Sequence, residues 1–289
     1  MNTGDDIQRI TPGMAQYPAL LKEIKGYPRE LFCIGDTALL QKRCVAVVGS
    51  RRTNSYGRSV AVKISKSIAS AGLVVVSGMA SGIDTCAHRG ALDAQGGTIA
   101  VLGCGIDICY PAENGGLKKE IEQKGLIVSE YGPGMKPKKY FFPQRNRIIS
   151  GLSEVTVVAQ AGNSSGALIT ADLAGEQGRE VCAVPGNIDS SYNMGSNKLI
   201  RDGAFPLLNP ADILDMLGVC CRDREEIEKL MSSSELKIYN ALESTGEATI
   251  DELCMMLSKP PSYVAGMVTI MEMKGLLFSD IGKIFIAKT

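Results

Sequence analysis

The sequence of 289 residues contains a single histidine, no tryptophan, and nine cysteines that form no C-x-x-C pair. One imidazole, that of His88, excludes most metal sites and catalytic triads, because these need several histidines or a histidine beside an activated nucleophile. Cysteines scattered singly through apolar stretches are typical of reduced core residues, not of a disulfide framework or a zinc site. We therefore predict a protein without a metal or a cofactor.

Long apolar runs are also missing. No run reaches the roughly 18 to 20 residues that a membrane-spanning helix needs. The N-terminus carries Asp5 and Asp6 and lacks the apolar core of a signal peptide. With 45% apolar residues the chain can bury a sizeable core, and its length favours one large domain and a small one. We expect a soluble, cytoplasmic protein with no membrane span.

Acidic residues are absent from two long segments, although the net charge is zero. Seven basic residues and no acid lie between Thr37 and Ile83, and five basic residues and no acid lie between Tyr131 and Ser153. In contrast, residues 211–289 hold thirteen acids and eight bases. This asymmetry indicates that one region meets a polyanion while the C-terminal region does something else.

The run K-K-Y-F-F-P-Q-R-N-R (138–147) interleaves cations with aromatic rings. Cations bind phosphates through counterion release, and ring or guanidinium planes provide faces on which any base can stack. The composition therefore predicts a cationic, aromatic loop that binds single-stranded nucleic acid. A solvated basic loop with two phenylalanines in the core would have the same composition.

Short apolar runs alternate with helix-length segments along the chain. The runs span residues 44–49, 73–78, 98–103, 126–131, 155–160 and 180–186. Continuously apolar runs of this length are typical of buried parallel strands. The segments between them begin with polar residues and end at glycine, as helices do. This pattern predicts an α/β fold with a doubly wound, mostly parallel, Rossmann-like sheet.

Glycine-rich or polar loops follow these strands, and the carboxyl ends of parallel strands share one edge of a sheet. Five such loops span residues 49–57, 77–84, 103–107, 160–167 and 185–189. Ser165 and Gly166 stand where a helix begins, and the free amides and positive end of a helix attract anions. With Arg51 in the first loop, this edge is predicted to bind phosphate. Tight turns alone would explain one or two of the loops, whereas five at one edge favour a phosphate-binding face.

Two enzyme classes share such a sheet. A dinucleotide dehydrogenase needs G-x-G-x-x-G in the first turn and an acid after the second strand, whereas this chain has G-S-R-R-T-N-S-Y-G and Ser77. A nucleotide-hydrolysing enzyme of the lysine-decarboxylase-like (phosphoribohydrolase) type needs a catalytic glutamate in the loop at 161–170, and no acid follows there until Asp172. The second class stays open as the alternative function.

Several long motifs follow one another between residues 44 and 210. They read G-S-R (49–51), S-G-M-A-S-G-I-D-T-C-A-H-R-G-A-L (77–92), A-V-L-G-C-G-I-D-I-C-Y-P-A-E-N (100–114), F-P-Q-R-N-R-I-I-S-G-L-S (142–153), S-G-A-L-I-T-A (165–171) and P-G-N-I-D-S-S-Y-N-M-G-S-N-K-L-I-R-D-G-A (185–204). In this order the motifs resemble the DNA-processing protein A (DprA, also called Smf) family. The resemblance implies a bacterial, non-enzymatic homodimer that binds single-stranded DNA, protects incoming strands during natural transformation and loads the RecA recombinase on them.

The resemblance also implies which residues form the DNA site. They come from the G-S-R turn, the cationic loop, the F-P-Q-R-N-R motif, the S-G-A-L-I-T-A helix and the closing motif. The implied DNA-binding residues are Gly49, Ser50, Arg51, Lys138, Lys139, Phe142, Arg145, Asn146, Arg147, Ser165, Gly166 and Asn197. One departure is visible, because Gln160 stands where the family usually has a glutamate. The absence of this glutamate removes a negative charge near the anion site.

The domain organisation follows from these patterns. We expect an N-terminal extension packed on the core (1–43), the Rossmann-like DNA-binding domain (44–219), a charged linker (220–233) and a winged-helix-like domain (234–289). The last unit is expected to have three helices and a hairpin, an arrangement that often enters a DNA groove. Because its candidate recognition helix carries only Lys259 and Lys274 at its edges, we expect a regulatory or protein-contact role.

Overall fold

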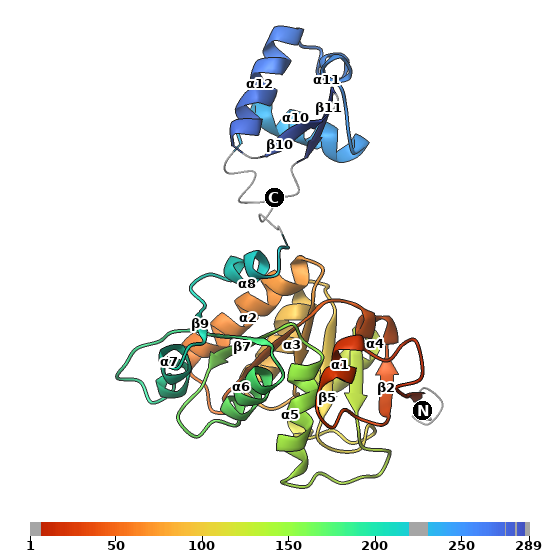
Figure 1. Ribbon diagram of the computed structural model, residues 1–289, viewed down its shortest axis with the longest axis vertical. Coiled ribbons are helices and arrows are strands. Elements are labelled where there is room, and N and C mark those ends of the chain that lie inside the picture. Colours follow the sequence, from red (N-terminus) through yellow and green to blue (C-terminus); the bar gives the residue numbers. More distant parts are fainter. Residues whose placement is uncertain (1–6, 220–230, 275, 281, 287–289) are drawn as a thin grey trace. The chain divides into compact units, whose positions relative to one another are not determined.

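In a computed structural model of the chain, the structure describes residues 7–219, 231–274, 276–280 and 282–286. The chain forms two compact units, Met1–Ile213 and Leu214–Thr289 (Figure 1). Most of the linker expected at 220–233 lies outside the described residues.

The first unit is built on a nine-stranded sheet. Its strands are β1 (Gln8–Ile10), β2 (Leu31–Gly35), β3 (Cys44–Gly49), β4 (Val74–Ser77), β5 (Thr98–Leu102), β6 (Leu126–Ser129), β7 (Val155–Gln160), β8 (Glu180–Ala183) and β9 (Phe205–Pro206). They are ordered β1-β2-β6-β5-β4-β3-β7-β8-β9. The strands from β6 to β9 pair in parallel. This mostly parallel, Rossmann-like sheet confirms the predicted α/β class.

The strand order reverses beside β3. From β3 the chain proceeds through β4 and β5 to β6 on one side, and it then returns to add β7, β8 and β9 on the other side. In a doubly wound sheet, ligands bind outside the carboxyl ends of the strands at this switch point. A site is therefore expected at the loops after β3 and β7.

The N-terminal segment extends the sheet at its other end. Strand β2 pairs antiparallel with β6, with Phe32 opposite Ser129, and β1 pairs antiparallel with β2. The apolar run L-F-C-I-G of β2 supplies Leu31 and Cys33, which are fully buried. The extension therefore contributes two strands to the sheet, which the sequence pattern did not predict.

Helices cover both faces of this sheet (Figure 1). One face carries α2 (Ser55–Ser70), α3 (Ile83–Asp93) and α4 (Gly115–Lys124), and the other carries α1 (Ala19–Glu23), α5 (Phe141–Gly151), α6 (Gly166–Glu176) and α7 (Met194–Arg201). The short helices η1 (Thr37–Gln41), η2 (Ala112–Asn114) and α8 (Ala211–Met216) complete the described helices of this part of the chain.

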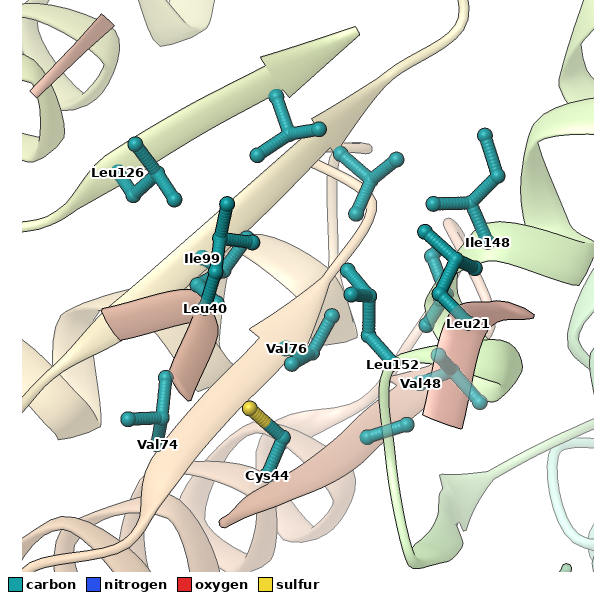
Figure 2. Packing of buried hydrophobic residues seen from close by; sticks show 14 of the residues in the cluster. Leu21, Leu40, Cys44, Val48, Val74, Val76, Ile99, Leu126, Ile148 and Leu152 are labelled. Atoms are coloured by element: carbon teal, nitrogen blue, oxygen red, sulfur yellow. The ribbon is translucent and has the colours of Figure 1, made fainter. Parts of the chain in front are cut away.

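Successive side chains of a strand point to opposite faces of the sheet. Because helices cover both faces, the side chains on each face are buried. In β5, Ile99 and Val101 pack into the core beside α5, whereas Ala100 and Leu102 pack into the core beside α4. Figure 2 shows the first of these cores, in which strand residues meet helix residues such as Ile148. Burial of each large apolar side chain stabilises the fold by about 1.5 to 3 kcal/mol. The sheet is thus a rigid base for the loops at its edge.

The second unit contains α10 (Ser233–Thr245), α11 (Ile250–Leu257) and α12 (Pro261–Met273), followed by the antiparallel hairpin β10 (Leu277–Asp280) and β11 (Lys283–Ile286). Capping boxes begin two of its helices: Ser232 with Glu235 at α10, and Thr249 with Glu252 at α11. Apolar residues from all three helices and the hairpin share one small core, which includes Leu242, Leu253, Val268 and Ile284.

Candidate nucleic-acid interface

A pocket of about 840 Å³ opens at the switch point, outside the carboxyl ends of β3 and β7. The turn after β3, the helix start after β7, the beginning of α5, and the loops after β4, β5 and β8 all contribute to it. The lining residues are Val48, Gly49, Ser50, Arg51, Arg52, Ala80, Asp84, Tyr110, Lys139, Phe142, Pro143, Arg145, Asn146, Ile149, Gly162, Ser164, Ser165, Gly166, Ala167, Ile169, Thr170, Ser191 and Tyr192. Nine of the twelve residues that the sequence predicted are in this lining.

Three exposed cations line the pocket: Arg51, Arg52 and Lys139. The turn that carries the arginines is held close to its neighbours, since Ser50 donates its backbone N–H to the carbonyl of Gln160 at 2.8 Å. The backbone of Gly82 also lies close to this turn. Only a glycine fits there, because a Cβ would lie 2.5 Å from the carbonyl oxygens of Ser50 and Arg51. Four positive charges, including the buried one of Arg145, face the single lining carboxyl of Asp84. The pocket therefore attracts anions.

Aromatic rings lie among these cations. The guanidinium carbon of Arg51 lies 5.4 Å from the centroid of the Phe142 ring, within the range of a cation–π contact. The ring of Tyr110 is 5.3 Å from that of Phe142, at an interplanar angle of 39°. Tyr110 is 43% exposed, and Phe142 is half-buried. The pocket thus combines accessible ring surface with positive charge.

The N-terminus of α6 forms another part of the wall. Ser165 is the N-cap, and its hydroxyl oxygen accepts a hydrogen bond from the backbone N–H of Ala167. Gly166 is exposed and has open space where a Cβ would be. The amides of a helix N-terminus carry partial positive charge, so this wall adds to the attraction of the pocket for phosphate.

Arg145 lies at the floor of the pocket and is only 4% exposed. Its guanidinium donates to the backbone carbonyls of Gly78 (2.7 Å) and Val101. Burial lowers the pKa of Arg145 to about 10, although the nearby carboxyl of Asp84 acts in the opposite direction. Burial likewise raises the pKa of Asp84, which accepts backbone hydrogen bonds from Ala80, Gly78 and Gly49. Arg145 thus contacts the loop after β4 and strand β5, and Asp84 contacts the end of β3 and the loop after β4.

The sequence predicted that the cationic segment forms one loop, but part of it is helical. Residues 141–151 form helix α5, whose proline at position 143 lies in the first turn, where its missing N–H is tolerated. Residues two apart on a helix point in different directions. Arg145 and Arg147 therefore cannot both face the pocket, and only Arg145 is in its lining.

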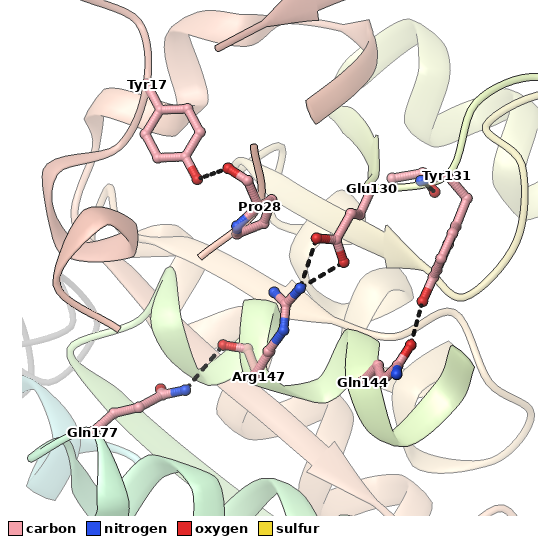
Figure 3. A network of polar contacts seen from close by, with 8 residues as sticks. Tyr17, Pro28, Glu130, Tyr131, Gln144, Arg147 and Gln177 are labelled. Carbon is pink, nitrogen blue, oxygen red and sulfur yellow. Dashed lines mark hydrogen bonds and ion pairs between the residues drawn. The ribbon is translucent and has the colours of Figure 1, made fainter. Parts of the chain in front are cut away.

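Arg147 belongs to a separate polar network (Figure 3). Its Nη2 donates to both carboxylate oxygens of Glu130 at 2.6 Å, and its carbonyl oxygen accepts from the side chain of Gln177. Nearby, Tyr131 donates its hydroxyl hydrogen to Gln144. Arg147 thus joins α5 to the end of β6 and to the residue that follows α6, away from the predicted site.

Two further predicted residues lie outside the lining. The ammonium group of Lys138 lies over the rings of Tyr140 and Phe141, at 5.9 Å and 5.5 Å from their centroids. Asn197 exchanges two hydrogen bonds with the backbone of Gly186, at 3.1 Å and 2.9 Å. Asn197 therefore fixes the loop after β8, and Lys139 is the lysine that lines the pocket.

Gln160, at the end of β7, is fully buried, and both polar atoms of its side-chain amide form hydrogen bonds. Its Nε2 donates to Asn54 Oδ1 at 3.0 Å and to Asn193 Oδ1 at 2.8 Å, and its Oε1 accepts from Thr53 at 2.7 Å. Asn54 Oδ1 also accepts from the backbone N–H of Gly57 as the N-cap of α2. A glutamate at position 160 could not make the two donor contacts. In this chain the glutamine that replaces the family's usual glutamate is therefore hydrogen-bonded to neighbouring side chains.

The accessible lining residues that sequence reasoning missed include Arg52, Tyr110 and Tyr192. The loops at 103–107 and 185–189 were identified as parts of the site edge. Extending each loop to its next aromatic residue would have found Tyr110 and Tyr192. Arg52 could have been found as the neighbour of Arg51 in the same exposed turn.

His88 is fully buried, its Nδ1 lies 2.8 Å from the Thr98 hydroxyl, and burial lowers its pKa to about 3. Among the residues that the structure describes, no group of histidine, cysteine and acidic side chains could hold a metal ion. Within the same residues, no helix is both long and apolar enough to cross a bilayer.

Comparison with known proteins places this geometry in a family. A family model described as DNA recombination-mediator protein A matches residues 8–218. The DNA processing protein DprA of Bacillus subtilis is 44% identical over 212 residues, covering 73% of this chain and 71% of that protein. The putative DNA processing protein DprA of Mycobacterium tuberculosis is 38% identical over 86% of this chain, which spans 66% of that longer protein, just under two thirds.

Solved structures agree with the sequence comparison. DNA processing protein A from Streptococcus pneumoniae has a TM-score of 0.71 and 42% identity, covering 73% of this chain and 74% of that one. The protein from Helicobacter pylori, whose structure concerns its single-stranded DNA binding mode, has a TM-score of 0.66 and 33% identity and covers 73% and 95%. Since the family model matches more than half of its residues, this chain belongs to the DNA recombination-mediator protein A (DprA) family.

Proposed function

We propose that the pocket at the switch point binds single-stranded DNA. The observation that carries this proposal is the juxtaposition of the exposed cations Arg51 and Lys139 with the rings of Tyr110 and Phe142 in one lining. Cations bind the phosphates of any strand, and aromatic faces stack on any base. The structure of the Helicobacter pylori protein concerns a single-stranded DNA binding mode, and this supports the same function.

The arrangement favours a single strand over a duplex. Aromatic residues can stack only on a base whose face is free, and in a duplex both faces of each base are covered by neighbouring pairs. Phosphate contacts alone would bind both forms, so strand selectivity comes from Tyr110 and Phe142. We propose that the residues of the pocket bind DNA without reading its sequence.

The wider role that we propose is the one implied by family membership. The protein protects incoming DNA and loads the RecA recombinase on it during natural transformation or recombination, and it acts in the cytoplasm as a homodimer. A dimer would place two pockets on one particle, and a long strand that reaches both would bind more tightly through effective concentration. Membership of a family of recombination mediators supports this proposal.

The second unit has a different role in this proposal. We propose a winged-helix-like domain from its three helices and hairpin, with α12 in the position of the recognition helix. The exposed surface of α12 includes Tyr263, Ile270 and Met273, which carry no positive charge to attract phosphates. We therefore assign a regulatory or protein-contact role to this unit, rather than duplex reading.

One experiment separates the proposal from the enzymatic alternative. Purified protein is mixed with a labelled oligothymidine, with a blunt duplex of equal length, and with nucleoside monophosphates. We expect a gel shift of the single strand, weak retention of the duplex and intact monophosphates. Equal retention of both DNA forms would contradict the site, and release of free base from a monophosphate would favour the phosphoribohydrolase-like enzyme.

A further inference from the structure

The pocket has a second apolar wall that DNA-binding motifs did not indicate. Ile169, in the first turn of α6, and Tyr192, in the loop after β8, both line the pocket, and each is 42% exposed. Tyr110 follows β5, whereas Tyr192 follows β8, so the strand order places them on the two sides of the switch point. The anion-attracting groups, Arg51 and the start of α6, come from the central strands β3 and β7.

The loop that carries Tyr192 is firmly attached to the end of β7. The next residue, Asn193, is 5% exposed and accepts a hydrogen bond from the buried amide of Gln160 at 2.8 Å. Beyond it, Gly195 donates its backbone N–H to the carbonyl of Ala161 at 2.8 Å. The Tyr192 ring therefore projects from a fixed backbone although nearly half of its surface is exposed. An aromatic side chain on a fixed support loses little conformational entropy when it binds a ligand.

We propose that Tyr192, together with Ile169, forms a second base-contact platform for single-stranded DNA. This inference rests on the proposed function of the pocket. One base contacts the Tyr110–Phe142 wall, another contacts Tyr192, and the phosphates between them are bound by Arg51 and the amides at the start of α6. The pocket then binds at least two nucleotides across the switch point. Gln160 acts as a positioning residue, because its bond to Asn193 sets the place of the platform.

The first test measures affinity and its salt dependence together. Tyr192→Ala is expected to weaken binding of an oligothymidine about 5- to 150-fold, the effect of losing one base–aromatic stack. The slope of log affinity against log salt should stay at the wild-type value, because no phosphate contact is lost. Tyr192→Phe, which keeps the ring, should bind like the wild type.

A matched control uses Tyr27, which is also 42% exposed but is not in the pocket lining. Tyr27→Ala should leave affinity unchanged. Melting temperatures of all variants establish that each is folded. If Tyr192→Ala binds oligothymidine as tightly as Tyr27→Ala does, the platform does not exist.

The second test uses the unaltered protein, so it does not depend on the folding of a variant. An oligonucleotide containing 5-iodouracil is bound and irradiated, and the crosslinked tryptic peptides are identified by mass spectrometry. We expect a crosslink in peptide 180–198, whose only tyrosine is Tyr192. If the wild type binds the strand but crosslinks only elsewhere, this inference fails and the proposed function survives. If the wild type does not bind the strand at all, the proposed function itself fails.

Discussion

The guanidinium of Arg51 lies over the ring of Phe142, 5.4 Å from its centroid, and so joins the turn after β3 to the start of α5. Both residues line the pocket, and neither is fully buried. The contact holds the charge and the ring within reach of one nucleotide. A phosphate near Arg51 and a base near Phe142 would therefore be bound as a unit.

Substitution of both residues tests this unit. Arg51→Ala should weaken binding to all sequences alike, and Phe142→Ala should cost about 1 to 3 kcal/mol of binding free energy. Because the two side chains are in contact, the double variant should differ from the sum of the single ones by about 0.5 kcal/mol or more. Fluorescence anisotropy with labelled oligothymidine measures all four proteins. Strict additivity would contradict joint binding.

Arg145 should behave differently from Arg51. Arg145→Met removes the donor to the Gly78 carbonyl and leaves the carboxyl of Asp84 buried without its nearby positive charge. Loss of one partner of a buried charge pair costs about 3 to 5 kcal/mol of unfolding free energy. Urea unfolding measures this loss, and the exposed Arg52→Ala serves as the control, expected within about 0.5 kcal/mol of the wild type. An Arg145→Met variant with wild-type stability would contradict its place at the floor.

Gln160→Glu should destabilise the protein at neutral pH by about 1 to 3 kcal/mol, because a carboxylate cannot donate to Asn54 and Asn193. Burial would raise the pKa of the new carboxyl, so the deficit should shrink as the pH falls and the group takes up a proton. Thermal unfolding at several pH values measures the difference from the wild type. A deficit that grows towards low pH would contradict this arrangement.

His88 predicts a loss of stability in weak acid. Its folded pKa is lowered from 6.5 to about 3 by burial, so below pH 6.5 the unfolded chain binds a proton that the folded chain does not. Stability should therefore fall as the pH drops from 6.5 towards 3, by about 2 kcal/mol at pH 5. Asp84, whose pKa is raised, acts in the opposite direction. His88→Asn retains Asp84, so a comparison with the wild type isolates the histidine; identical pH profiles would show that His88 does not titrate as described.

Much of the fold could be predicted because buried parallel strands are continuously apolar and are followed by glycine-rich turns. The run at 44–49 is one such strand, and Arg51 lies in the turn that follows it, so both the strand and its site residue were found. The strands β1 and β2 were not predicted, since a short antiparallel edge strand such as Gln8–Ile10 has no distinctive pattern.

The side chains of the site were harder to assign, because composition does not indicate direction. The run at 138–147 carries cations at both of its ends, yet the helix that begins at Phe141 directs Arg145 to the floor and Arg147 to Glu130. Tyr192 was missed for another reason. It is a single aromatic residue distant in sequence from the basic segments, and it lies just beyond the loop at 185–189 that the sequence placed at the edge of the sheet.

The salt dependence of single-strand binding tests the central claim most directly. If about four phosphates are neutralised, log affinity for oligothymidine should fall with log salt at a slope near −3, and Arg51→Ala should make that slope shallower by about 0.7. Arg9→Ala removes the same charge from an exposed side chain on β1, where Arg9 pairs with Glu30, and should keep the wild-type slope. An Arg51→Ala protein with the slope and affinity of Arg9→Ala would contradict the assignment of the pocket as the DNA site.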